Sequence, residues 1–140
     1  MAAQPAGYSG TPLAKKLGIK PGHVVAVLDE PDGFRDWLEP HEARLRKSLG
    51  RDPDVVIAFA TSRRVLERRI WAASEAIFPD GALWVAWPKK ASRVPTDITE
   101  DVVRELALPL GLVDNKVCAI NAVWSGLRLA WRRSERSRKQ

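Results

Sequence analysis

Two short polar segments carry the side chains best suited to bind a charged ligand. Thr61 and Ser62 follow one apolar stretch of the sequence, and Lys89, Lys90 and Ser92 follow the next. Hydroxyl and ammonium groups donate hydrogen bonds to phosphate and carboxylate oxygens, and a helix beginning near Ser62 would add its free backbone N–H groups. These residues predict a site for a small anion. The alternative is that the hydroxyls only cap a helix while the lysines are solvated.

Two of the six tryptophans, at the end of an apolar stretch and in a loop, are candidates for a surface that contacts a partner. Trp87 precedes Pro88 at the end of an apolar stretch, and Trp124 lies in a loop. A loop indole can stack on a base or pack against a protein partner. The simpler interpretation, which we take as the default, is that both side chains cover a small core. Trp84, inside an apolar stretch, is expected in the core.

The sequence offers no other set of residues with catalytic or metal-binding spacing. His23 and His41 are the only histidines and are not spaced as metal ligands, so no metal site is predicted. Cys118 lies in an apolar segment, where an inert buried thiol is expected, and one cysteine cannot form an internal disulfide. No catalytic residue is named, and the sequence favours a binding protein over an enzyme.

The elements that position these residues alternate between strand and helix patterns. Unbroken apolar runs predict buried strands, because such runs need cover on both faces of a sheet. The predicted strands of this kind are residues 24–28, 54–59 and 82–87. Helical periodicity predicts three helices, over residues 11–18, 61–77 and 97–110. Asp97 and Glu100 are expected to cap the last of them.

The end of the chain predicts an antiparallel hairpin. Residues 116–120 form one strand, and the alternation in residues 127–132 is typical of a half-exposed strand at the sheet edge. Residues 34–49 permit two interpretations. Their apolar residues share one helical stripe that Pro40 interrupts, whereas residues 43–49 alternate as a strand would. Four residues before the next strand are too few for an ordinary parallel crossover.

This order of elements predicts a small Rossmann-like α/β domain with three layers. Its mainly parallel sheet would have five or six strands and a C-terminal antiparallel hairpin, resembling a shortened class I methyltransferase fold. The expected domain covers residues 11–133, between a flexible segment 1–10 and a basic, disordered tail 134–140. No apolar run reaches the length of a membrane span and no secretory signal is seen, so a cytoplasmic protein is expected.

The features with which that fold holds a nucleoside cofactor are missing. Such a site needs a glycine-rich turn after the first strand and an acidic residue after the second. The residues after Leu28 are Asp-Glu-Pro-Asp-Gly, with one glycine, and the residue directly after Leu49 is a glycine instead of an acidic residue. We therefore predict no cofactor and no binding of S-adenosylmethionine.

The net charge of +6 is concentrated at the C-terminus, where residues 132–140 hold five basic residues and one acidic residue. The leading functional prediction is a non-catalytic binding or regulatory domain for a small anionic ligand or a protein partner. One alternative is weak nucleic-acid association through the basic tail. A second is a degenerate methyltransferase-like enzyme.

Several long strings in the chain resemble the bacterial domain-of-unknown-function 3052 family, over nearly its whole length. They are AGYSGTPLAKKLGIKPG (6–22), LWVAWPKKAS (83–92), TDITEDVVRE (96–105), GLVDNKVC (111–118) and WSGL (124–127). The resemblance implies no particular reaction, because that family has no assigned chemistry. Relatives have a strand start near residues 41–45, which favours the strand interpretation for residues 43–49.

Overall fold

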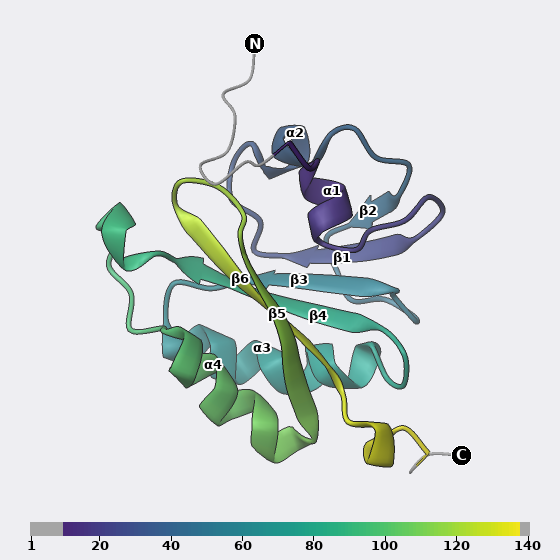
Figure 1. Ribbon diagram of the computed structural model, residues 1–140. Coiled ribbons are helices and arrows are strands. Elements are labelled where there is room, and N and C mark those ends of the chain that lie inside the picture. Colours follow the sequence, from purple (N-terminus) through teal and green to yellow (C-terminus); the bar gives the residue numbers. More distant parts are fainter. Residues whose placement is uncertain (1–9, 138–140) are drawn as a thin grey trace.

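Residues 10–137 are described by the computed structural model, and their apolar runs form the parallel half of one sheet (Figure 1). β1 (Val24–Leu28), β3 (Val55–Phe59) and β4 (Ala82–Pro88) are buried almost throughout. They pair in parallel, β3 lying between the other two. β2 (Arg44–Arg46) pairs in parallel with the outer side of β1, so the strand interpretation is confirmed over three residues.

The shortness of β2 explains how so few residues can lead from it to β3. β2 and β3 lie on opposite sides of β1, and both run parallel to it. Because β2 has only three residues, the connection must return along a short strand before β3 begins, and a loop over residues 47–54 is long enough without a crossover helix. The first part of the ambiguous stretch is a separate short helix, α2 (Phe34–Leu38).

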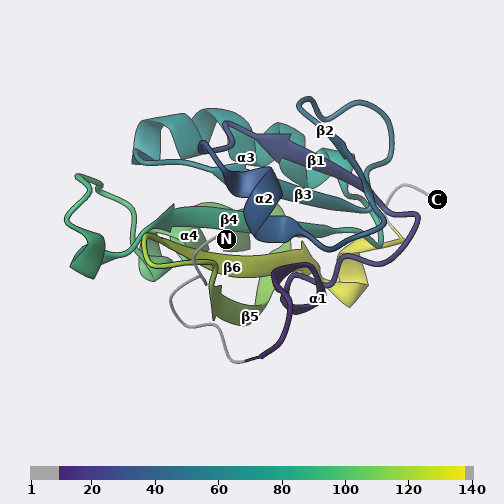
Figure 2. The same ribbon diagram turned by 90° about the horizontal axis from the view of Figure 1, so that it is seen from above.

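The predicted C-terminal antiparallel hairpin is confirmed, but its position at the sheet edge is not as expected. β5 (Leu112–Ala119) and β6 (Trp124–Trp131) are antiparallel, and β6 also pairs with β4. The strand order is β2-β1-β3-β4-β6-β5, which Figure 2 follows from above. The prediction that residues 127–132 form the edge strand is therefore wrong. Arg128 interrupts the apolar pattern because it lines a cavity, not because β6 faces open solvent.

Four helices cover the two faces of the sheet, which gives the expected three layers (Figure 1). α3 (Arg63–Ala76) and α4 (Glu100–Ala107) bury one apolar stripe each against one face, whereas α1 (Leu13–Lys16) and α2 cover the other. Alternate strand residues point to the two faces, so the sheet separates two apolar clusters. Burial of these apolar side chains supplies the main favourable free energy of folding. Among residues 10–137, no helix is long and apolar enough to cross a membrane.

Two fully buried tryptophans attach the helical layers to the sheet. Trp84 on β4 is in the core, as expected, and its indole Nε1–H donates to the carbonyl of Leu17, 2.9 Å away, at the end of α1. Trp131 on β6 donates to the carbonyl of Ser74 in α3 at 2.8 Å. A buried indole needs such a partner, so each tryptophan both fills the core and fixes a helix in place.

Short 3-10 turns complete the chain. η1 (Lys90–Ser92) follows β4, and η2 (Leu108–Leu110) extends α4. η3 (Arg133–Glu135) occupies the start of the segment expected to be a disordered tail, and the Arg136 side chain donates to the carbonyl of Trp131. Of the flexible segment predicted at 1–10, residues 1–9 lie outside the described part of the chain, as do residues 138–140 of the tail.

Candidate functional site

The carboxyl end of β3 leads directly into α3, as the sequence predicts. Ser62 is the N-cap residue of α3, and its Oγ accepts a hydrogen bond from the backbone N–H of Val65 at 3.2 Å. Thr61, one residue earlier, is exposed. The capping function expected for Ser62 is therefore present, while the Thr61 hydroxyl, at the rim of the sheet, has no hydrogen-bond partner in the described part of the chain.

The N-terminus of α3 already holds an anionic group from the chain itself. The Asp97 carboxylate accepts a hydrogen bond of 2.6 Å from the backbone N–H of Arg63, the first residue of the helix. The expectation that Asp97 caps α4 is therefore wrong: Thr99 caps that helix, accepting from the N–H of Val102 at 3.2 Å. With Asp97 and Ser62 in place, the first turn of α3 has little left to offer an external anion.

The predicted lysines lie away from the N-terminus of α3, at a cavity at the carboxyl end of β4. This cavity has a volume of about 590 Å³. Lys89 and Lys90 line it together with Arg93, which follows η1. Its apolar lining comes from the end of β4 and from the segment that leads to α4; the residues concerned are Trp87, Pro88, Val94, Pro95 and Ile98. We call this the β4 cavity.

The three cations of the β4 cavity have no ion-pair partner among residues 10–137. Lys89 is half-buried, and Lys90 and Arg93 are exposed. The one acidic residue in the lining, Glu100, is engaged by Arg104, which also binds Asp114 at 3.1 Å. Partner carboxylates hold the pKa of Arg104 above its ordinary value. The cavity therefore has a positive electrostatic potential and an apolar lining.

Ser92 has a structural function at this cavity. Its Oγ donates to the carbonyl of Lys89 at 2.6 Å and accepts from the backbone N–H of Val94 at 3.2 Å. These two bonds close the turn that carries Lys90 and Arg93 to the cavity rim. Arg93 itself has a φ of 65°, a left-handed conformation that orients the chain at the end of the turn. Arg93 is not predicted from the sequence, where its only signal is its place three residues after Lys90.

Thr61 and Trp124 line a second hollow, of about 350 Å³, between the carboxyl ends of β1 and β3. Trp124 packs edge-to-face on Phe59, with ring centroids 5.0 Å apart. Trp87, by contrast, is only 6% exposed and belongs to the core cluster on the α3 face. The structure thus places the predicted site residues at two adjacent openings of one sheet edge. A partner surface stays a prediction that depends on Trp124.

The loop after β1 does not fit a nucleoside cofactor. Asp29 forms a two-pronged ion pair with Arg69 of α3, both contacts at 3.2 Å, which ties this loop to the helix. Gly33, the only glycine of the loop, has a φ of 86°, and a Cβ there would lie 3.2 Å from the Trp37 indole nitrogen. The space beside this glycine is therefore filled by the chain's own side chain.

The end of β2 does not fit a ribose either. Arg46 stands at the end of that strand, and its guanidinium donates to the carbonyls of Leu49 and Arg51. A cation folded onto its own loop takes the place of the acidic side chain that would accept from ribose hydroxyls. The residues present therefore do not fit S-adenosylmethionine held in the usual way.

Other reactive groups are separate from these cavities. Cys118 is half-buried on β5, and burial raises the pKa of its thiol despite the nearby charges of Lys16 and Lys116. A protonated thiol is a poor nucleophile, which agrees with the inert cysteine expected from the sequence. In the described part of the chain, no three His, Cys, Asp or Glu side chains gather in a way that could hold a metal ion.

Comparison with solved structures identifies the fold. A putative type 11 methyltransferase from Sulfolobus solfataricus matches with a TM-score of 0.62 at 14% identity, covering 95% of this chain and 96% of that one. A SAM-dependent methyltransferase from Aquifex aeolicus matches with a TM-score of 0.61 at 10% identity, covering 84% and 86%. No protein-family profile and no curated protein sequence matches the chain. The chain therefore has a shortened class I methyltransferase fold, with a sheet of six strands.

Proposed function

We propose that this chain is a degenerate methyltransferase-fold protein that binds a small anionic molecule in the β4 cavity. The observation that carries the proposal is the set of three cations around one cavity of about 590 Å³, Lys89, Lys90 and Arg93, which find no carboxylate partner within residues 10–137. The cavity lies at the carboxyl edge of the parallel strands, where open α/β sheets bind ligands. The fold itself supports descent from a methyltransferase and carries no activity by itself.

The chemistry of the lining supports one class of ligand. Lysine and arginine donors recognise phosphate and carboxylate oxygens, and the guanidinium of Arg93 can bind such a group with two parallel hydrogen bonds. Val94, Pro95 and Ile98 provide an apolar wall beside these charges. A ligand with a phosphate or carboxylate on an apolar or aromatic body would satisfy both parts of the cavity.

Assignment to the domain-of-unknown-function 3052 family is part of the same proposal. The LWVAWPKKAS and TDITEDVVRE strings, which carry much of that resemblance, contribute most of the lining of the β4 cavity. A binding site built from the segments that define the resemblance would be a shared property of such chains.

Calorimetric titration with phenyl phosphate and with inorganic phosphate tests this proposal. We expect phenyl phosphate to bind more tightly than inorganic phosphate, because only the former uses the apolar wall. Each charge-assisted hydrogen bond contributes about 1.5–3 kcal/mol, so Lys89→Ala combined with Lys90→Ala should weaken binding about tenfold or more.

The matched control replaces Arg44 and Lys47 with alanine, because this pair removes the same charge from exposed positions on and after β2, away from the cavity. Loss of binding in the lysine variant but not in the control supports the site. Equal affinities in both variants and the wild type would show that Lys89 and Lys90 are ordinary surface charges.

A further inference from the structure

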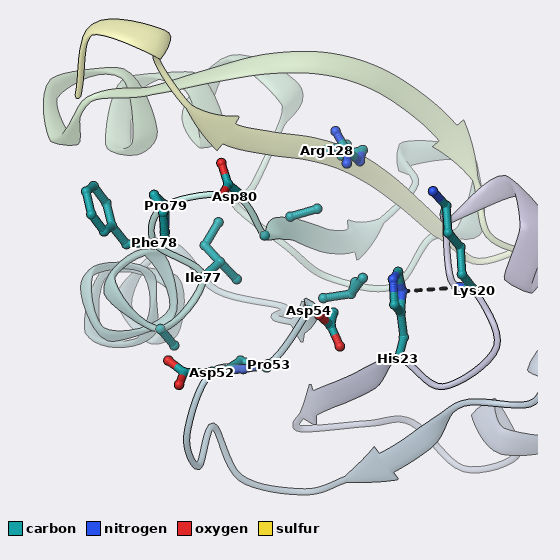
Figure 3. Close-up of a pocket in the computed structure, with 15 residues that line it drawn as sticks. Lys20, His23, Asp52, Pro53, Asp54, Ile77, Phe78, Pro79, Asp80 and Arg128 are labelled. Atoms are coloured by element: carbon teal, nitrogen blue, oxygen red, sulfur yellow. Dashed lines mark hydrogen bonds between the residues drawn. The ribbon is translucent and has the colours of Figure 1, made fainter. Parts of the chain in front are cut away.

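A further cavity, of about 430 Å³, opens at the opposite edge of the sheet, where β1, β3 and β4 begin (Figure 3). This amino-edge cavity is independent of the site proposed above and of the carboxyl edge where this type of sheet ordinarily binds ligands. Its lining contains both signs of charge. In Figure 3, Arg128, Lys20 and His23 lie on one side of the opening, and Asp52 and Asp80 lie on the other.

Arg128 is the most unusual group in this cavity. It is half-buried on β6, and within residues 10–137 it has neither an ion pair nor a hydrogen-bond acceptor. Burial without a compensating charge lowers the pKa of its guanidinium. The strand register places Lys116 of β5 directly opposite, so the nearest cross-strand charge is repulsive. A desolvated cation in such surroundings costs free energy that an apolar side chain would not.

One carboxylate of the cavity, that of Asp54 beside His23 (Figure 3), is held in place by hydrogen bonds of its own residue. The Asp54 carboxylate oxygen Oδ2 accepts from the backbone N–H of Val24 at 2.8 Å. The Asp54 backbone also bonds to both neighbours, donating to Val24 at 2.8 Å and accepting from Ala82 at 3.1 Å. Three hydrogen bonds thus fix this residue between β1 and β4, and its other carboxylate oxygen stays available to a ligand.

The turn before β4 brings a further carboxylate to the same opening. A Cβ on Gly81 would lie 3.0 Å from the backbone oxygens of Asp54 and Ile77, so the turn packs directly on both segments and a larger residue would require them to shift. Asp80, the residue before it, therefore reaches the rim of the cavity together with Asp52.

His23 provides an oriented donor on the same side of the cavity as Lys20. Its Nδ1 accepts a hydrogen bond of 3.1 Å from the backbone N–H of Lys20. Because Nδ1 is the acceptor in this bond, the proton of the neutral ring lies on Nε2, which can donate to a ligand oxygen.

We propose that the amino-edge cavity binds a small zwitterion of the α-amino-acid type, its carboxylate toward Arg128 and Lys20 and its ammonium group toward Asp54, Asp52 and Asp80. An anion alone would face three carboxylates, and a cation alone would face the unpartnered Arg128. A dipolar ligand satisfies both sides at once, and a charge-assisted bond to Arg128 would offset the cost of its desolvation.

The test is titration of ¹⁵N-labelled protein with the twenty proteinogenic amino acids, each added singly, followed by amide chemical shifts. At least one amino acid should shift the amides of Val24, Asp54 and Gly81. Its deaminated acid and its decarboxylated amine should each bind at least about tenfold more weakly, because each lacks one charged contact.

Arg128→Met should weaken that amino acid at least about tenfold, whereas Arg44→Met, which removes a cation from exposed β2, should not. Asp52→Asn, on a loop residue with a φ of 47° that asparagine tolerates, provides a second variant for the acidic side and should also weaken binding. Unchanged affinity in both cavity variants would overturn the proposal. So would the absence of binding by all twenty amino acids, or shifts confined to residues 89–93.

Discussion

Replacing Asp97 with alanine should destabilise the domain by removing the anionic partner of the α3 N-terminus. In the structure this carboxylate lies 2.6 Å from the backbone N–H of Arg63, although Asp97 is 34 residues away from Arg63 in the sequence and outside α3. The bond thus joins the segment before α4 to the first turn of α3. The Arg63 side chain reinforces the junction by contacting Glu105 of α4 at 3.0 Å.

Two known effects set the size of the loss. A side-chain acceptor at a helix N-terminus contributes about 0.5–2 kcal/mol. A negative charge there adds about 0.3–1 kcal/mol through the helix dipole. Because Asp97 is exposed, solvent screens the second effect, and we expect a loss of about 1–2 kcal/mol for Asp97→Ala. Asp97→Asn keeps an acceptor oxygen and should lose less.

Urea unfolding followed by tryptophan fluorescence measures this free energy. Asp101→Ala is the matched control, because its side chain is 86% exposed, bonds to Arg104 of the same helix and, in the first turn of α4, contributes through the helix dipole without joining two segments. Added sulfate should restore more stability to Asp97→Ala than to the wild type, since the vacated N–H groups can then bind an external anion. If Asp97→Ala unfolds at the same urea concentration as Asp101→Ala, the carboxylate does not hold this junction.

Three further outcomes follow from the same structure. Trp84→Phe should cost about 1–3 kcal/mol from the unpaired Leu17 carbonyl alone, measured by urea unfolding, and a cost near zero would show that this buried hydrogen bond is dispensable. Because burial raises the pKa of Cys118, the native thiol should react with iodoacetamide at pH 8 more slowly than the thiol of the urea-unfolded chain, and equal rates would contradict this prediction. The stability linked to the protonated thiol is present below the unfolded pKa of about 8.5 and is lost as the pH rises through the higher native pKa. Truncation after residue 136 keeps η3 and removes Arg138 and Lys139, two of the five basic residues at the C-terminus, so it should weaken any tail-dependent binding to DNA or RNA measured by fluorescence anisotropy. Undiminished binding would place the nucleic-acid surface elsewhere.

The strands and their alternation with helices were predictable because local signals agreed with the tertiary structure. The runs at 24–28, 55–59 and 82–87 contain no polar residue, and such runs form central parallel strands. The capping of α3 by Ser62 was predictable for the same reason, because an N-cap bond joins residues only three apart in the sequence. The length of β5 was underestimated, because Asp114 and Asn115 in its first half interrupt the apolar pattern at an edge strand.

The failures share a physical cause, which is contact between residues far apart in sequence. Asp97 and Glu100 have the spacing of a capping pair, yet Asp97 turns to α3 because the two helices pack side by side. The alternation around Arg128 indicated solvent on one side of β6, whereas a cavity produces the same pattern. The tertiary structure places Arg93 in the β4 cavity with the predicted lysines and places Thr61 in the neighbouring hollow with Trp124. Neither placement follows from local sequence.

The amide chemical shifts of ¹⁵N-labelled protein, titrated in parallel with phenyl phosphate and with S-adenosylmethionine, test the central claim most directly. The structure predicts that phenyl phosphate shifts Lys89, Lys90 and Arg93, around the β4 cavity, while S-adenosylmethionine leaves the loop from Asp29 to Gly33 unchanged. Shifts in that loop at micromolar S-adenosylmethionine, with no response at residues 89–93 to phenyl phosphate, would show instead that the chain has kept the cofactor site of a methyltransferase.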